Sequence, residues 1–145
     1  MSEASLWSRA REELSPFGKL ERIENGIAKG TPDVAWLLRR YPRVDPVSGW
    51  LELKYEPAWP SSDARPVIIK KLRREQVDFA EGWSGAGGRS FFLLQVGRDY
   101  VLFGEPVARL IFDRAATRPL ILGMATASAE GRGFPTADIV KGLTA

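Results

Sequence analysis

The sequence predicts a domain of the α/β or α+β class, in which one mixed β-sheet is flanked by helices. Residues 5–14 and 69–83 carry apolar side chains at helical spacing. Five short apolar runs are bounded by glycine, proline and polar residues, as strands commonly are. The resulting order is helix, three strands, helix, two strands and a short helix, which a layered core can accommodate.

The first helix ends before Pro16 and Gly18, and the second ends near Gly82 after a proline- and serine-rich loop at residues 56–66. A third helix is expected at residues 106–115. The expected strands are residues 19–28, 32–38, 50–55, 90–96 and 100–103.

Residues 117–145 are rich in alanine, glycine and threonine and contain only brief apolar runs. The sequence assigns them no role. We therefore divide the chain into one domain at residues 1–116 and a C-terminal extension at residues 117–145.

Composition limits the chemistry that the chain can perform. The 145 residues are 44% hydrophobic and include five Trp and seven Phe, enough for a real core. The chain contains no Cys and no His, which excludes zinc fingers, His-metal nucleases, Ser-His-Asp hydrolases and Cys-His enzymes. Any metal must be held by oxygen ligands, as Mg²⁺, Mn²⁺ and Ca²⁺ are.

Charge and hydropathy restrict the possible partners less than composition restricts the chemistry. The formal charge of +3 is consistent with a polyanionic partner, but also with many proteins that bind no nucleic acid. No apolar run approaches the roughly 20 residues that span a bilayer, and the first residues are charged too early for a secretory signal. We expect a cytoplasmic protein with no membrane association.

Asp33, Glu52 and Lys54 are the strongest candidates for a chemical role. Side-chain alternation along the strand puts Glu52 and Lys54 on one face. Pro32 suits the start of a strand, so Asp33 opens a strand that a hairpin would lay beside Glu52. Both carboxylates could then bind one hard divalent cation, with the Leu53 carbonyl as another ligand. Without Asp33, a Glu-x-Lys tripeptide would be ordinary on an exposed strand.

This combination suits hydrolysis of a phosphodiester bond. A carboxylate-bound divalent ion makes water nucleophilic near neutral pH and neutralises charge in the transition state. The Lys54 ammonium can stabilise the attacking hydroxide or a nonbridging phosphate oxygen. The neighbouring Glu52 favours the protonated form of that lysine.

Thr31-Pro32-Asp33 followed by Glu52-Leu53-Lys54, in this order of helices and strands, resembles the PD-(D/E)xK nucleases. The phrases RIENGIAKGTPDV and GWLELKY are most similar to the small VRR-NUC and phage-type enzymes related to archaeal Holliday junction resolvases. The resemblance covers roughly residues 13–103 and rests on a short motif. It implies a restriction-endonuclease-like core and Mg²⁺, replaceable by Mn²⁺, as the cofactor, with no organic cofactor.

Gln76 lies inside the apolar stripe of the second helix, which contains Leu72, Phe79, Ala80 and Trp83. Burying its amide without partners would cost about 1 to 3 kcal/mol, so we expect a hydrogen bond to the carboxylate and metal cluster. The resemblance also implies a catalytic Gln at this position. A helix rotated to bring Gln76 to solvent is the open alternative.

Basic residues gather where the second helix is expected to begin. Cations in a first turn oppose the helix dipole, and a bound phosphate would offset this. A solvated basic turn is the alternative. The candidate contacts to a DNA backbone are Lys29, Arg65, Lys70, Lys71, Arg73 and Arg74.

The resemblance implies one more catalytic acid, and two candidates stay open. Glu13 lies near the apolar edge of the first helix, whereas Glu24 belongs to the phrase before the Gly-Thr-Pro-Asp turn. Either could instead be a surface salt-bridge partner. Trp36 and Trp50 are expected in the core, and Trp59, in its loop, is a candidate for DNA contact.

Three hypotheses follow. The first is a Mg²⁺-dependent DNA endonuclease, acting as a homodimer on branched or duplex DNA in phage or mobile-element DNA processing, and in the bacterial host cytoplasm if phage-encoded. The second is a noncatalytic nucleic-acid-binding module on the same fold. The third is a structural phage or scaffold protein in which the motif is accidental.

Overall fold

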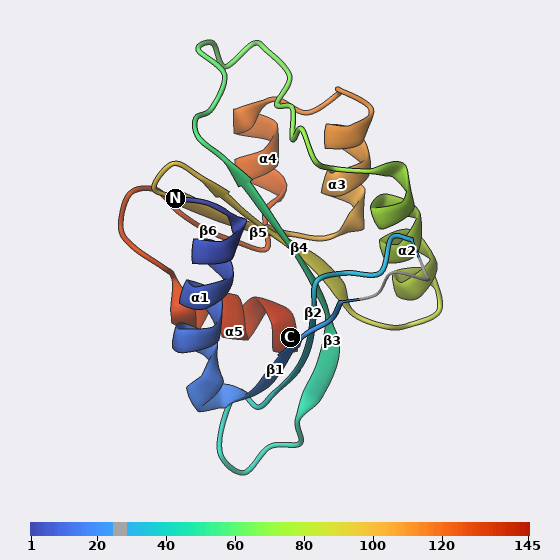
Figure 1. Cartoon of the computed structure of the whole chain (residues 1–145), viewed down its shortest axis with the longest axis vertical. Helices are drawn as coiled ribbons and strands as arrows, with labels where there is room; N and C mark the ends of the chain where they lie inside the picture. Colours follow the sequence, from blue (N-terminus) through green and yellow to red (C-terminus); the bar gives the residue numbers. More distant parts are fainter. Residues whose placement is uncertain (25–28) are drawn as a thin grey trace.

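A six-stranded β-sheet forms the centre of the structure, a computed structural model that describes residues 1–24 and 29–145 (Figure 1). Its strands follow one another across the sheet in chain order. Neighbouring strands are antiparallel, except that β3 and β4 are parallel. The strands are β1 (Gly18–Arg22), β2 (Val34–Leu38), β3 (Val47–Glu56), β4 (Ser90–Val96), β5 (Asp99–Phe103) and β6 (Ala127–Ala129).

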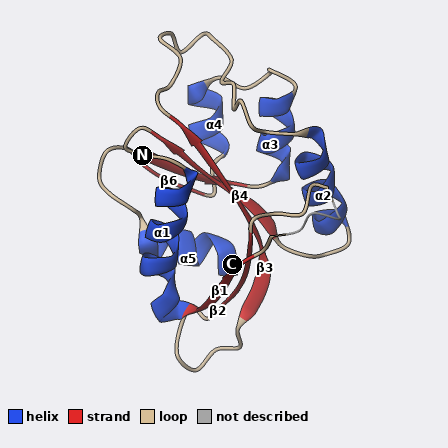
Figure 2. Cartoon of the chain, in the orientation of Figure 1, coloured by secondary structure: helices blue, strands red, loops and turns tan. Residues whose placement is uncertain are grey.

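Helices cover both faces of this sheet (Figure 2). One face packs against α1 (Glu3–Leu14) and α5 (Thr136–Thr144), and its apolar cluster includes Leu51 and Leu53. The other face packs against α2 (Arg74–Gly85), α3 (Glu105–Phe112) and α4 (Arg118–Met124). A short 3₁₀ turn, η1 (Ser15–Phe17), joins α1 to β1. The predicted mixed sheet with flanking helices is confirmed.

Alternation along β3 is as expected from the sequence. Leu51 and Leu53 are buried in the cluster under α1 and α5. Glu52 and Lys54, also buried, belong to the opposite face. The strand begins earlier than predicted, at Val47, whereas β1 ends earlier, at Arg22; residues 25–28 of the predicted first strand lie outside the described residues.

The second helix begins at Arg74, so the prediction that it begins at residue 69 is wrong. The main-chain groups just before this helix bond to side chains of β3. The Lys71 carbonyl accepts a hydrogen bond from the Lys54 ammonium, and the Lys70 N–H donates to the Glu56 carboxylate. A helix running through these residues would need the Lys71 carbonyl for its own ladder. Leu72 is nevertheless buried, as its place in the apolar stripe predicts.

Residues 117–145, which the sequence left without a role, share both apolar clusters with the rest of the chain. β6 pairs with β5, with Tyr100 opposite Ala129. Ile121 of α4 is buried in the α2 and α3 cluster, and Ile139 of α5 is buried beside α1. This segment therefore completes one edge of the sheet and part of each helical layer.

Across the described part of the chain, no helix has both the length and the apolar character that crossing a membrane requires.

Candidate active site

Asp33 and Glu52 meet where β2 begins beside β3. The Asp33 N–H donates to Glu52 Oε2 at 3.1 Å, and the Leu53 N–H donates to Asp33 Oδ2 at 3.0 Å. The antiparallel ladder of the two strands ends at the pair Val34 and Leu51, next to Asp33 and Glu52. These two bonds therefore extend the pairing through side chains. The juxtaposition of carboxylates that the sequence predicts is present.

The loop before Asp33 is fixed by a close approach to α2. Gly30 has a φ of +86°, a conformation that favours glycine. A Cβ on Gly30 would lie 2.2 Å from the main-chain oxygen of Glu75, in the first turn of α2. Pro32 next to Asp33 is buried. The loop thus holds the Asp33 carboxylate between β3 and the start of α2.

Lys54 and Gln76 converge on the same oxygen of Glu52. The Lys54 ammonium, on a residue that is 3% exposed, lies 3.2 Å from Glu52 Oε1 and donates to the Lys71 carbonyl at 2.9 Å. Gln76 Nε2 donates to Glu52 Oε1 at 2.7 Å, and Gln76 Oε1 accepts the Arg73 N–H at 3.0 Å. The predicted hydrogen bond between Gln76 and the carboxylate cluster is confirmed, and the second bond fixes the orientation of the amide.

The Glu52 carboxyl is strongly perturbed. The residue is 2% exposed, and desolvation together with the nearby Asp33 carboxylate raises its pKa to about 8, against a smaller opposing effect of Lys54. Two neighbouring carboxylates repel each other when both are ionised, and Lys54 offsets this only in part, since the pKa of Glu52 stays raised. A site with this arrangement therefore favours binding of positive charge.

The oxygen atoms at this point suit a hard divalent cation. In an extended strand the N–H and C=O of one residue point to the same side. Because the Leu53 N–H points to Asp33, the Leu53 carbonyl faces the same side, beyond the end of the β2 ladder. Among the residues that the structure describes, no group of three or more Asp, Glu, His or Cys side chains could hold a metal. A cation here would be held by Asp33, Glu52, the Leu53 carbonyl and water, a donor set that Mg²⁺ accepts.

These residues line a cavity of about 700 Å³. Its walls come from α1, the loop before β2, β3 and the segment leading into α2. The lining residues are Glu3, Ile23, Lys29, Gly30, Thr31, Asp33, Glu52, Lys54, Lys71, Arg73, Glu75 and Gln76.

Neither additional acid predicted from the sequence lines this cavity. Glu13 accepts a hydrogen bond from Thr136 Oγ1 at 2.7 Å and lies 3.5 Å from Arg9, so it connects α1 to α5. Glu24 is exposed. The acid that α1 does contribute is Glu3, which lies 3.7 Å from the Lys71 ammonium.

A signal for Glu3 was present in the sequence. Leu6, Ala10 and Leu14 are the buried positions of α1. Glu3 precedes Leu6 by three residues, so it continues the same helical stripe toward the N-terminus. The acid at the end of the buried stripe was therefore a better candidate than Glu13, which lies beside it.

The predicted basic residues divide into two groups. Lys29, Lys71 and Arg73 line the cavity. Arg65, Lys70 and Arg74 do not: Arg65 lies in the loop region near Trp59, the Lys70 N–H bonds to Glu56, and the Arg74 guanidinium lies 6.0 Å from the Phe112 ring centre. Only Arg74 of this set is in the first turn of α2, so the predicted basic first turn is wrong. Lys71 and Arg73 contribute charge from the preceding segment instead.

The tryptophans also separate by role. Trp59 donates from Nε1 to Asp99 at 2.7 Å, and the Arg118 guanidinium lies 5.1 Å from its ring centre. These contacts fasten the loop at residues 56–66, a structural role that the sequence did not predict. DNA contact by Trp59 stays a prediction. Trp36 is buried, and Trp50 packs edge-on against Phe79, as expected of core residues.

Gln76→Leu is expected to weaken Mg²⁺ binding by about 10- to 100-fold, because the substitution removes the group that orients Glu52. Isothermal titration calorimetry with Mg²⁺ or Mn²⁺ would measure this. Gln95→Leu is the matched control, since Gln95 is a buried amide whose Nε2 bonds to the Gly97 carbonyl. Equal metal affinity in Gln76→Leu and the unaltered protein would contradict the assignment.

No family model matches the chain, and no match was found among curated proteins.

Proposed function

We propose that the protein is a metal-dependent endonuclease that hydrolyses phosphodiester bonds in DNA. One observation carries the proposal: Asp33, just before β2, lies beside Glu52 of β3, and a buried Lys54 ammonium lies 3.2 Å from Glu52. The Asp33 N–H donates to Glu52, and the Leu53 N–H donates to Asp33. Carboxylates that need a cation, beside an ammonium that is held in place, match the needs of phosphoryl hydrolysis.

A divalent cation at this position would supply a polarised water and neutralise charge that develops on the phosphate. Asp33, Glu52 and the Leu53 carbonyl would hold it. Gln76 keeps Glu52 oriented, and its own orientation is set by the Arg73 N–H. The metal-binding groups are thus fixed by hydrogen bonds before the metal or DNA binds. This lowers the reorganisation that catalysis requires.

Lys54 would act on the phosphate or the attacking water. Its ammonium has two anchors, Glu52 Oε1 and the Lys71 carbonyl, and an ammonium offers three N–H donors. The third donor would bond to a nonbridging oxygen or to the nucleophilic hydroxide. A buried lysine with its position fixed stabilises developing negative charge more strongly than an exposed one, because water screens it less.

The cations at the cavity wall support a polyanionic substrate. Lys29, Lys71 and Arg73 line the same cavity as the carboxylates. Contacts from such residues to the DNA backbone would position the scissile phosphate and make affinity fall with salt concentration.

The test is incubation with a panel of linear, nicked, flapped and four-way DNA in Mg²⁺ or Mn²⁺, with EDTA as the control. We expect cleavage products with either metal and none in EDTA. DNA retardation in a gel without products would indicate a noncatalytic binding module instead. Neither products nor retardation with any member of the panel would overturn the proposal.

A further inference from the structure

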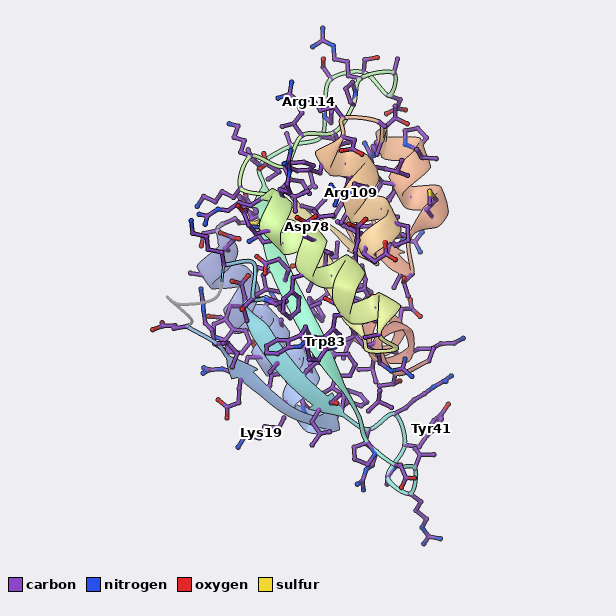
Figure 3. All side chains as sticks on the ribbon, turned by 90° about the vertical axis from the view of Figure 1, so that its right-hand side faces the viewer. Lys19, Tyr41, Asp78, Trp83, Arg109 and Arg114 are labelled. Carbon is purple, nitrogen blue, oxygen red and sulfur yellow. The ribbon has the colours of Figure 1, made fainter. Side chains whose placement is uncertain are left out.

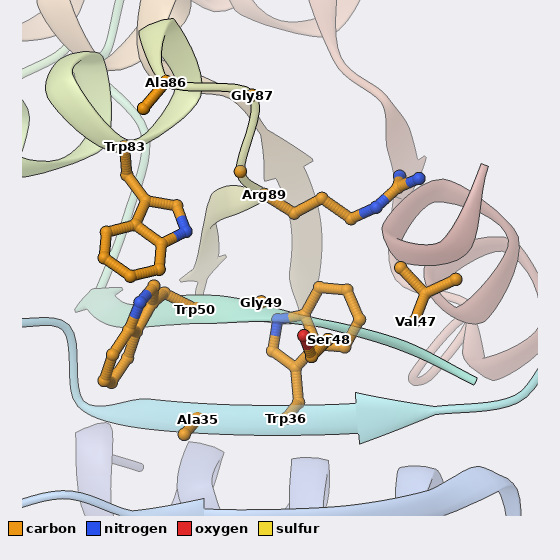
Figure 4. Close-up of a pocket in the computed structure, with 11 residues that line it drawn as sticks. Ala35, Trp36, Val47, Ser48, Gly49, Trp50, Trp83, Ala86, Gly87 and Arg89 are labelled. Atoms are coloured by element: carbon orange, nitrogen blue, oxygen red, sulfur yellow. The ribbon is translucent and has the colours of Figure 1, made fainter.

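A second cavity, of about 680 Å³, is lined by three tryptophans (Figure 4). Trp50 comes from β3, Trp83 from α2 and Trp36 from β2. The turn that follows α2 lines one side of it, and in Figure 4 the side chains of Trp50 and Trp83 point toward one another. Its other lining residues are Ala35, Val47, Ser48, Gly49, Ala86, Gly87, Gly88 and Arg89.

We propose that this cavity binds one unpaired nucleobase of the DNA whose backbone occupies the candidate active site. The inference deepens the proposed function and rests on it for the identity of the substrate. It narrows the substrate to DNA with a single-stranded or extruded nucleotide beside the bond that is cut, such as a gap, flap or junction.

Trp83 provides the stacking surface. Its indole is parallel to the Phe79 ring, with 5.4 Å between ring centres and 9° between planes, and Trp50 meets it edge-on at 5.8 Å. Yet 42% of Trp83 is exposed, and Figure 3 shows it at the end of α2, on the side that faces the viewer. A rigid aromatic side chain accessible from solvent is the usual platform for an unpaired base.

The turn after α2 holds this indole in place. A Cβ on Gly88 would lie 2.3 Å from Cδ1 and Nε1 of Trp83, so the main chain lies directly against the ring. A Cβ on Gly49 would similarly lie 2.5 Å from the Trp36 ring. The two glycines leave the space that the indoles occupy, and any larger residue would displace them.

The cavity's chemistry favours a neutral planar ring over a phosphate. Its one charged lining residue, Arg89, extends away from Trp50 and Trp83 toward α5, where it donates to the main-chain oxygens of Leu143 and Ala145 (Figure 4). The acids and lysines that suit a phosphate and a cation line the neighbouring cavity instead.

The two cavities follow one another along β3. Trp50 and Glu52 are two residues apart on the same face of the strand, a separation of about 7 Å. One nucleotide can bridge that distance, so a phosphate at Glu52 places a neighbouring base at Trp50 and Trp83. This continuity is what selects a nucleobase as the occupant.

The experiment uses DNA with 2-aminopurine in a single-stranded gap, mixed with protein in EDTA so that binding is measured without cleavage. We expect stacking to quench the 2-aminopurine emission. Trp83→Ala should abolish the quenching and weaken binding of gapped DNA about 10-fold, with little change for continuous duplex. Gly88→Ala should have the same effect, because its methyl group displaces the indole.

Two controls match these variants. Gly85→Ala adds the same methyl group three residues earlier, where it would meet no atom within 4 Å. Tyr41→Ala removes another exposed aromatic side chain, at the far end of the molecule in Figure 3. Both should quench and bind as the unaltered protein does. Trp83→Phe, which retains an aromatic ring, should restore part of the quenching.

Unchanged emission on binding, or equal affinity of Trp83→Ala and unaltered protein for gapped DNA, would overturn the base-binding site. If the unaltered protein still cleaves the DNA panel, either result leaves the proposed nuclease function standing. Conversely, quenching that depends on Trp83, without cleavage in Mg²⁺ or Mn²⁺, would support the base site and refute the nuclease.

Discussion

Asp33→Asn, Glu52→Ala and Lys54→Met are each expected to lower the rate of DNA cleavage by on the order of 10³-fold or more. Asp33→Asn keeps an oxygen that can accept the Leu53 N–H while removing the charge. Glu52→Ala removes the second carboxylate, and Lys54→Met keeps most of the apolar stem without the ammonium. Cleavage of a flapped or gapped substrate in Mg²⁺ would measure the loss.

DNA affinity should respond differently from rate. Asp33→Asn removes negative charge from a cavity lined by Lys29, Lys71 and Arg73, so metal-free DNA binding should be tighter. Glu52→Ala removes a carboxyl that keeps its proton until about pH 8, so metal-free DNA binding near neutral pH should be unchanged. Glu13→Ala is the control, because Glu13 contacts Thr136 and Arg9 outside the cavity, and it should cleave at the normal rate. Retained cleavage in all three site variants would end the nuclease hypothesis.

The second large effect is on stability, through the raised pKa of Glu52. The unfolded chain loses this proton near its ordinary pKa of 4.5, whereas the folded protein keeps it until about pH 8. Unfolding therefore releases a proton between these values, and the free energy of unfolding should fall as pH rises through that window. Because one pKa unit corresponds to about 1.4 kcal/mol, the total change should be on the order of a few kcal/mol.

A divalent cation should reverse this loss, because it binds the deprotonated carboxylates. Saturating Mg²⁺ should stabilise the protein strongly at pH 8 and little at pH 5. Urea unfolding at several pH values, with Mg²⁺ or with EDTA, measures both effects. Glu52→Gln should remove the pH dependence, and Glu21→Gln, in exposed β1, should keep it. Equal stabilisation by Mg²⁺ at pH 5 and pH 8 would show that Glu52 does not bind the metal.

Local patterns in the sequence were sufficient for the centre of this fold. Alternation along β3 predicted the faces of Glu52 and Lys54. Pro32 indicated that a strand begins at Asp33, and β2 begins one residue later, at Val34. Helical spacing left two orientations open for Gln76, and the structure shows the one toward the carboxylates. Each of these inferences depends on contacts within one element or between neighbouring strands, which side-chain periodicity encodes directly.

Features that depend on distant contacts were not predictable in the same way. Residues 117–145 lack strong periodicity because their strand and helices are short, and they are held by β5, α1 and the apolar cluster that contains residues of α2 and α3. The approach of Glu3 to Lys71 depends on how α1 crosses the sheet. The structural contact of Trp59 was not predicted because its partner, Asp99, lies 40 residues away in the chain.

The segment just before α2 has a strong intrinsic preference for helix, since lysine, leucine and arginine are all good helix formers. It stays irregular because Lys54 takes the carbonyl of Lys71 and Gln76 takes the N–H of Arg73. Local helix preference and the geometry of the candidate site therefore compete for the same few peptide groups. An added helical turn at the start of α2 would free the Lys54 ammonium, which the proposed chemistry needs held in place. A protein with this longer helix would therefore be less suited to the proposed reaction.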